Sequence, residues 1–338
     1  MRLEGKEALP IWGKMIPGNT GASKRDVMNI DTSLTMEDVF TKYPGIWDKS
    51  TPELGDLRGN DFMVWDQEMQ NGYAEETYSD VPILVPYLVE NSDRCVILCP
   101  GGAYLTKSMD SEGAEVAAVL NDAGISAFVL WYRSYPYRAP LMYLDCQRSV
   151  RYVRYHASEY GVDPEKIAVA GFSAGGNLCG VEALCFGNKP VEFEGYTPDE
   201  IDAVDGAPSA LGLIYPAVSM KDDKIVAVIA GKDVYSNPEK RNTFAAQYDL
   251  LTHVSEDTPP TFLCACMDDD VVPPLRLAEL TCAYKEKGAS CELHLFPYGG
   301  HGFGGCVPHV VGPFPPADFT AVSQWLELFV NWLERTLA

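Results

Sequence analysis

Residues 167–178 read Ile167-Ala-Val-Ala-Gly-Phe-Ser173-Ala-Gly-Gly-Asn-Leu178, a short apolar run that leads into a glycine-rich turn around a serine. The turn has the pattern Gly-x-Ser-x-Gly, and residues 177–186 after it are compatible with a helix. In such a strand–turn–helix the serine lies on a strained turn with its Oγ exposed. Glycines flank it because the turn needs unusual φ angles and the helix must approach the strand closely. The pattern alone is weak, but this context predicts that Ser173 is a nucleophile rather than a bystander in a turn.

A serine nucleophile needs a base, and the base needs a carboxylate to orient it. Downstream of Ser173, the apolar run 261–267 is followed by three consecutive aspartates, residues 268–270. The next apolar run, 291–296, leads into a glycine-rich loop that contains His301. A histidine just past a strand is well placed to reach the serine, so we expect His301 to be the base.

The other four histidines are weaker candidates for the base. His156 and His294 lie within a predicted helix and a predicted strand, and His253 lies in a loop before two prolines. His309, eight residues after His301, is the remaining rival.

A tetrahedral intermediate needs hydrogen-bond donors for its oxyanion. Residues 100–104, Pro-Gly-Gly-Ala-Tyr, form a glycine turn directly after the predicted strand 94–99. Backbone N–H groups of such a turn, together with the one that follows the nucleophile, make the oxyanion hole of serine hydrolases. We therefore expect the N–H groups of Gly102, Ala103 and Ala174 to form this hole.

From about residue 81 the chain alternates strand-like apolar runs with amphipathic stretches of helical period. This alternation is typical of βαβ units, and it predicts an α/β fold with a mostly parallel central sheet flanked by helices. The strands are predicted at residues 94–99, 126–132, 167–170, 210–215, 261–267 and 291–296. The helices are predicted at residues 112–123, 141–160, 177–186, 273–287 and 319–337.

Two regions depart from this alternation. Residues 1–79 are irregular and rich in turns, and with Trp12, Trp47 and Trp65 as anchors they are predicted to pack as an extension on the catalytic domain, residues 80–338. Residues 186–209, rich in proline and acidic side chains, are expected to form an inserted cap or loop that shapes the acyl pocket.

Within the helix predicted over residues 141–160, Arg148, Arg151 and Arg154 recur at every third position. A cationic row of this kind is usually a solvated face, so we expect these side chains to be exposed.

The composition and net charge limit the kinds of partner that this chain can bind. The 338 residues are 46% hydrophobic and carry a formal net charge of −22. So acidic a surface repels phosphate backbones and anionic lipid, and we expect neither a nucleic-acid nor a membrane partner. No apolar window reaches the roughly 18 residues of a membrane span. Because the N-terminus shows no apolar signal-peptide core, a cytoplasmic location is predicted.

The ten cysteines form no Cys-x-x-Cys pair, and several lie within apolar runs. In such runs a free thiol packs as a small hydrophobic group. We expect reduced cysteines and no zinc site. Serine, histidine and aspartate need no metal or organic cofactor for acyl transfer, so no cofactor is predicted.

Together these motifs resemble the α/β-hydrolase superfamily, and more narrowly its carbohydrate acetyl esterase and acetylxylan-esterase-like branch, which is related to the hormone-sensitive-lipase-like and feruloyl-esterase-like groups. In this family the catalytic acid is followed three residues later by Val and then Pro, a spacing that selects Asp269. The branch commonly has histidine where this chain has Asn177, so the role of that side chain is left open. The resemblance covers most of the chain and is tightest at residues 171–176, 257–262, 269–273 and 292–304.

The resemblance implies a serine esterase that removes short acyl groups, chiefly acetyl, from carbohydrates such as xylo-oligosaccharides. The triad would be Ser173, His301 and Asp269. A feruloyl esterase, short-chain lipase or carboxylesterase, a serine peptidase, and a non-catalytic binding member of the fold stay open as alternatives. The acyl-chain limit, the sugar and the presence of a homo-oligomer are not fixed by these patterns.

Overall fold

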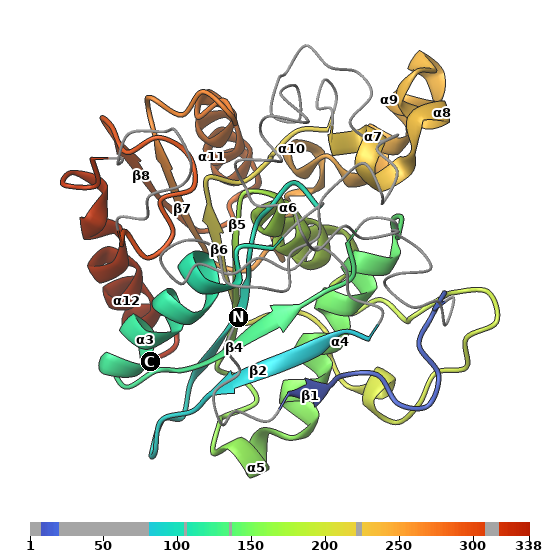
Figure 1. The fold of residues 1–338 in the computed structure, drawn as a ribbon, viewed down its shortest axis with the longest axis horizontal. Helices are drawn as coiled ribbons and strands as arrows, with labels where there is room; N and C mark the ends of the chain where they lie inside the picture. Colours follow the sequence, from blue (N-terminus) through green and yellow to red (C-terminus); the bar gives the residue numbers. More distant parts are fainter. Residues whose placement is uncertain (1–7, 20–80, 105–106, 135–136, 221–224, 308–317) are drawn as a thin grey trace, which may run out of the picture.

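The computed structural model describes residues 8–19, 81–104, 107–134, 137–220, 225–307 and 318–338 (Figure 1). At its centre lies an eight-stranded sheet with the order β1-β2-β4-β3-β5-β6-β7-β8. From β4 to β8 all neighbouring strands are parallel, whereas β2 pairs antiparallel with both β1 and β4. The predicted mostly parallel α/β sheet is confirmed. The strands are β1 (Leu9–Pro10), β2 (Ile83–Tyr87), β3 (Cys95–Cys99), β4 (Ser126–Trp131), β5 (Ile167–Phe172), β6 (Ala210–Ile214), β7 (Thr261–Cys266) and β8 (Cys291–Phe296).

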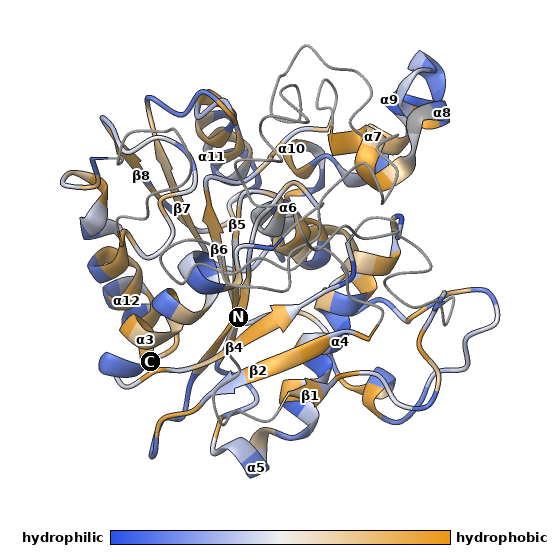
Figure 2. Cartoon of the chain, viewed as in Figure 1, coloured by the Kyte–Doolittle hydropathy of each residue, from blue (hydrophilic) through white to orange (hydrophobic). Residues whose placement is uncertain are grey.

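Helices cover both faces of the sheet, with α3 and α12 together on one face and α4 and α6 on the other (Figure 1). Every residue of β3, β5, β6 and β7 is therefore buried, and apart from Thr261 at the start of β7 these strands carry no polar side chain (Figure 2). The helices are α3 (Glu115–Asp122), α4 (Leu141–Tyr155), α5 (Ala157–Tyr160), α6 (Ala174–Val181), α7 (Ile225–Ala230), α8 (Lys232–Tyr235), α9 (Pro238–Tyr248), α10 (Leu250–His253), α11 (Leu275–Lys287) and α12 (Trp325–Thr336). Shorter turns are η3 (Met109–Ala114), η4 (Glu182–Phe186), η5 (Ile201–Ala203) and η6 (Val322–Gln324).

The helical predictions differ from the structure in their bounds: the helix predicted over 177–186 begins at Ala174, and the one predicted over 319–337 begins at Val322. The helix predicted over residues 112–123 begins earlier, as a π-helical turn, and the one predicted over 141–160 is divided at His156. The helices from α7 to α10, between β6 and β7, were not predicted at all. Figure 1 shows α7, α8 and α9 beyond the end of the sheet toward which β6 runs.

The N-terminal segment packs on the sheet where it is described. β1 adds to the edge of β2, and Trp12 donates its Nε1–H to Asp145 Oδ1 at 2.8 Å. The Trp12 ring also lies edge-on to Tyr196. Trp47 and Trp65 lie outside the described residues, so the packing of the rest of residues 1–79 stays a prediction.

The prediction that the arginine row of α4 is solvated is wrong for Arg148 and Arg151. The Arg148 side chain is fully buried and contacts Asp199 at 2.6 Å and Asp202 at 2.8 Å. Arg151 is 1% exposed and lies 3.9 Å from Asp202. Both aspartates belong to the predicted loop 186–209, which covers this face of α4. The sequence pattern indicates a row of charges but not the segment that lies over it.

No helix in the described part of the chain is long and apolar enough to cross a membrane.

Candidate active site

Ser173 lies on the sharp turn between β5 and α6. Its φ of 52° and ψ of −117° fall in a region that non-glycine residues rarely adopt, so the backbone is strained there. A Cβ added at Gly175 would lie 1.9 Å from the carbonyl oxygen of Cys99, because α6 starts directly against β3. The glycine is therefore required by the close approach, as the sequence pattern predicts.

Ser173, His301 and Asp269 meet at the ends of β5, β7 and β8. His301 Nε2 lies 2.8 Å from Ser173 Oγ, and its Nδ1 lies 2.7 Å from Asp269 Oδ2. The Asp269 side chain is buried, and its other oxygen accepts the backbone N–H groups of Val271 and Val272. The imidazole and the two backbone donors thus satisfy this buried carboxylate and hold it in one orientation.

The neighbouring aspartates have different positions. Asp268 is exposed and accepts the backbone N–H groups of Gly299 and Gly300 at 3.2 and 2.9 Å, just before His301. Asp270 is exposed as well. Of the three consecutive aspartates, Asp269 is the one beside the histidine.

The glycine turn after β3 lies directly against Ser173. A Cβ on Gly101 would lie 2.9 Å from Ser173 Cβ and 2.6 Å from the Phe172 carbonyl oxygen. Beyond it, Gly102 has a φ of 133° and Ala103 one of 55°, a left-handed conformation that alanine seldom adopts. Ala174 is the first residue of α6, where N–H groups have no partner within the helix. The predicted donors therefore lie on the two segments that flank the serine Oγ.

Asn177 has a structural role that its position explains. It is fully buried, its Oδ1 accepts the Tyr104 hydroxyl at 2.8 Å, and its Nδ2 donates to the Ala217 carbonyl at 2.8 Å. Both halves of the amide are used in tying the turn after β3 to the segment after β6.

The remaining histidines lie apart from this site where they are described. His156 contacts Glu159, and His294, in β8, contacts Glu292. His253 lies in α10 rather than in the predicted loop. His309 lies outside the described residues.

Two further polar groups beside the triad were not singled out from the sequence. Glu112, in η3, accepts the N–H of Gly101 and the Tyr215 hydroxyl, and Tyr215 lies against His301. Burial raises the pKa of the Glu112 carboxyl. In the sequence Glu112 lies at the start of a predicted helix, within residues 111–113, one of the segments that resemble the family, and Tyr215 ends a predicted strand. Neither pattern indicates this contact.

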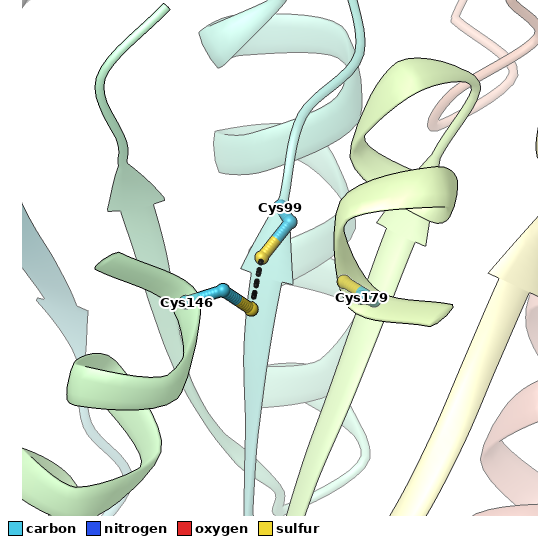
Figure 3. Close-up of side chains that lie close together, drawn as sticks. All are labelled: Cys99, Cys146 and Cys179. Atoms are coloured by element: carbon cyan, nitrogen blue, oxygen red, sulfur yellow. Dashed lines mark hydrogen bonds between the residues drawn. The ribbon is translucent and has the colours of Figure 1, made fainter. Parts of the chain in front are cut away.

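Three buried cysteines meet beneath the serine turn. Cys99 at the end of β3, Cys146 of α4 and Cys179 of α6 have their sulfur atoms within 4.8 Å of one another, with Cys99 and Cys146 at 3.9 Å (Figure 3). A soft metal ion would need these thiols as thiolates. Burial raises the pKa of Cys146 and Cys179 well above the usual range, which favours neutral thiols at these two positions. Burial also acts against the Cys99 thiolate, but hydrogen bonds from Cys146 and Cys179 lower the pKa of Cys99 to about 6. All ten cysteines are free.

The BD-FAE family model matches residues 81–283. Among solved structures, an acetyl ester-xyloside bifunctional hydrolase from Caldicellulosiruptor lactoaceticus is 34% identical with a TM-score of 0.65, over 75% of this chain and 88% of that one. Thermogutta terrifontis esterase 2, 22% identical with a TM-score of 0.60 over 78% of this chain and 95% of that one, shares the fold. The expected resemblance to α/β-hydrolase carbohydrate esterases is confirmed.

Two curated relatives are longer than this chain. The endo-1,4-beta-xylanase B of Butyrivibrio fibrisolvens is 30% identical over 264 residues, which are 75% of this chain and 38% of the relative. The acetylxylan esterase of Xylanibacter ruminicola is 29% identical over 228 residues, 65% of this chain and 43% of the relative. The chain thus spans about two fifths of the length of these relatives. With the family model matched over more than half of its residues, this chain belongs to the BD-FAE family of α/β hydrolases.

Proposed function

We propose that this protein is a serine carboxylic ester hydrolase whose triad is Ser173, His301 and Asp269. The observation that carries the proposal is the continuous chain of contacts from the Asp269 carboxylate through both ring nitrogens of His301 to Ser173 Oγ. An imidazole held in this way can take the serine proton as a general base and return it as a general acid.

In the proposed mechanism Ser173 Oγ attacks the ester carbonyl while His301 Nε2 accepts its proton. Asp269 keeps the other ring nitrogen protonated and stabilises the imidazolium that forms. The backbone N–H groups of Gly102, Ala103 and Ala174 are the proposed donors to the oxyanion. His301 then protonates the departing alcohol, and water repeats the cycle on the acyl-enzyme.

We infer that the substrates are short acyl esters, chiefly acetyl esters, of carbohydrates such as xylo-oligosaccharides. Support comes from the names of the relatives: one is an acetylxylan esterase, and one solved neighbour is an acetyl ester-xyloside hydrolase. The net charge of −22 favours neutral sugars over anionic ligands.

The proposal is tested by initial rates on p-nitrophenyl acetate, butyrate and octanoate and on an aminoacyl p-nitroanilide, beside acetate release from acetylated xylo-oligosaccharides. Activity that is confined to acetyl esters and absent from Ser173→Ala is expected. A preference for octanoate or the anilide would overturn the substrate assignment. Equal rates in Ser173→Ala would overturn the mechanism.

A further inference from the structure

Glu112 places a buried carboxylate directly behind the serine turn. The residue is 4% exposed and belongs to η3, and it has two partners from different parts of the chain. Its Oε2 accepts the N–H of Gly101, in the turn after β3, and its Oε1 accepts the hydroxyl of Tyr215 at 2.9 Å. Neither contact belongs to the triad or to the proposed oxyanion donors.

Tyr215 connects this carboxylate to the loop of the catalytic histidine. Its ring lies edge-on to the His301 ring, with centroids 4.9 Å apart, and its hydroxyl oxygen accepts the N–H of Gly304 at 3.1 Å. The residue directly follows β6 and has a φ of 39°, a strained conformation for a tyrosine. Such strain persists only where the surrounding contacts fix the residue firmly.

The direction of each hydrogen bond is determined. The backbone groups of Gly304 and Gly101 can only donate, and burial raises the pKa of Tyr215 well above its usual range, so the phenol keeps its proton. Tyr215 accepts from Gly304 and donates its O–H to Glu112 Oε1. At position 112 this arrangement uses two acceptor atoms, which the two oxygens of the carboxyl group supply.

We propose that Glu112 is a positioning residue that holds the turn of residues 100–104 and the loop of residues 299–304 at a fixed separation on either side of Ser173. This inference rests on the proposed function, because it concerns the alignment of the oxyanion donors with His301 as the acyl intermediate forms. The electrostatic interaction between Glu112 and His301 has the sign that stabilises the imidazolium formed in that step.

The central test is Glu112→Gln, which keeps the shape of the side chain but replaces one acceptor with an N–H₂ donor. In one orientation of the amide its N–H₂ group faces the N–H of Gly101, and in the other it faces the Tyr215 oxygen, so the phenol hydrogen loses its acceptor. With p-nitrophenyl acetate we expect kcat per active site to fall about tenfold to a hundredfold, while KM changes less than about threefold. Active sites are counted by titration with diethyl p-nitrophenyl phosphate, so loss of folded protein does not contribute.

A matched control is Glu182→Gln, the same substitution at another fully buried glutamate. Glu182 lies in η4, and in the described part of the chain neither of its carboxylate oxygens has a hydrogen-bond partner. We expect kcat and KM of this variant to stay within about twofold of the parent values.

Tyr215→Phe removes only the hydroxyl and keeps the proposal testable if Glu112→Gln does not fold. We expect a decrease in kcat of about fivefold to fiftyfold, and a double variant less than about twofold worse than the weaker single one, because both changes break one network. The inhibition constant of an alkyl trifluoromethyl ketone, whose hemiketal oxygen occupies the oxyanion position, should rise in parallel with the loss of kcat/KM.

A kcat per titrated site within about twofold of the parent in both folded single variants would overturn the role of Glu112. Activity that survives in Ser173→Ala gives a different result: it would overturn the proposed function and, with it, this inference.

Discussion

Charged groups are buried both around Ser173, at the carboxyl ends of the parallel strands, and on the outer face of α4. The two regions differ in the partners that satisfy these charges. On α4, the Arg148 guanidinium is paired directly with the carboxylates of Asp199 and Asp202. Around the serine, Asp269 and Glu112 are satisfied mainly by backbone N–H groups, a hydroxyl and an imidazole.

This difference indicates that the charges on α4 stabilise the fold, whereas those around Ser173 serve the proposed reaction. The ion pairs on α4 attach the loop of residues 186–209 to this helix. Because the paired charges cancel, they leave no net charge that could act on a bound molecule. Neutral donors instead keep a negative charge in place beside His301, where a positive charge develops during the proposed reaction. Substitutions in the first region should therefore change stability, and those in the second should change rate.

The largest effect is expected for the triad itself. Ser173→Ala should lower kcat/KM at least about 10⁴-fold and Asp269→Asn about 10³- to 10⁴-fold, because the serine attacks and the carboxylate selects the histidine tautomer. Both variants should unfold within a few degrees of the parent by circular dichroism. A rate for Asp269→Asn within tenfold of the parent would contradict the assigned acid.

Arg148→Ala should have the next largest effect, on stability rather than on rate. The substitution leaves the buried Asp202 without its main partner, and we expect the free energy of unfolding to fall by about 3–5 kcal/mol. The measurement is urea unfolding, with kcat per titrated site unchanged. The control is Arg94→Ala, whose pair with Asp93 is partly exposed and should contribute less than about 1 kcal/mol. Equal losses in the two variants would show that burial does not set the effect.

Asp268→Asn tests how firmly the loop that carries His301 is held. The amide can accept only one of the two N–H groups that Asp268 now holds, those of Gly299 and Gly300. We expect kcat/KM to fall about threefold to tenfold, because the loop that carries His301 is held less firmly. Asp270→Asn, at an exposed neighbour, should have no measurable effect. If both variants behave alike, Asp268 does not hold the loop.

The last expected effect is a gain in stability from Glu182→Gln. Burial raises the pKa of Glu182 well above 4.5, so the folded protein keeps a proton that the unfolded chain releases. The contribution of Glu182 to the free energy of unfolding is fully present at pH values below the pKa of this carboxyl in the unfolded chain. It decreases as the pH rises toward the pKa of the same carboxyl in the folded protein. The variant should therefore be more stable by roughly 1–2 kcal/mol at pH 8 and by less at pH 5.

The same denaturation series with Glu256→Gln, at an exposed glutamate, supplies the control for Glu182→Gln. A gain that does not depend on pH would contradict the burial explanation.

Much of the fold could be predicted because its signals are local. The central strands are continuous apolar runs, and the turn glycines at Ser173 follow from close approach, so both are visible in short windows of sequence. Asp269 and His301 follow strands, and strand ends meet at one edge of a parallel sheet. Only the choice of Asp269 among three aspartates needed the family spacing.

What the sequence did not predict depends on tertiary contacts. Arg148 has the spacing of an exposed charge, and only the loop that carries Asp199 buries it. The helix α7 has the sequence Ile-Val-Ala-Val-Ile-Ala, which in isolation favours a strand as much as a helix. Glu112 and Tyr215 are 103 residues apart, and no pattern in either segment points to the other.

The antiparallel end of the sheet has a consequence for self-association. β1 is only two residues long and pairs with Ile83 and Leu84 alone, and prolines lie at Pro10 in β1 and Pro86 in β2. Each proline lacks a backbone N–H. An extended segment of another chain that lay along this side of the sheet would therefore find hydrogen-bond donors missing at these positions. Within the described residues, edge-to-edge aggregation is therefore disfavoured at the β1 side by covalent structure, without any added charge.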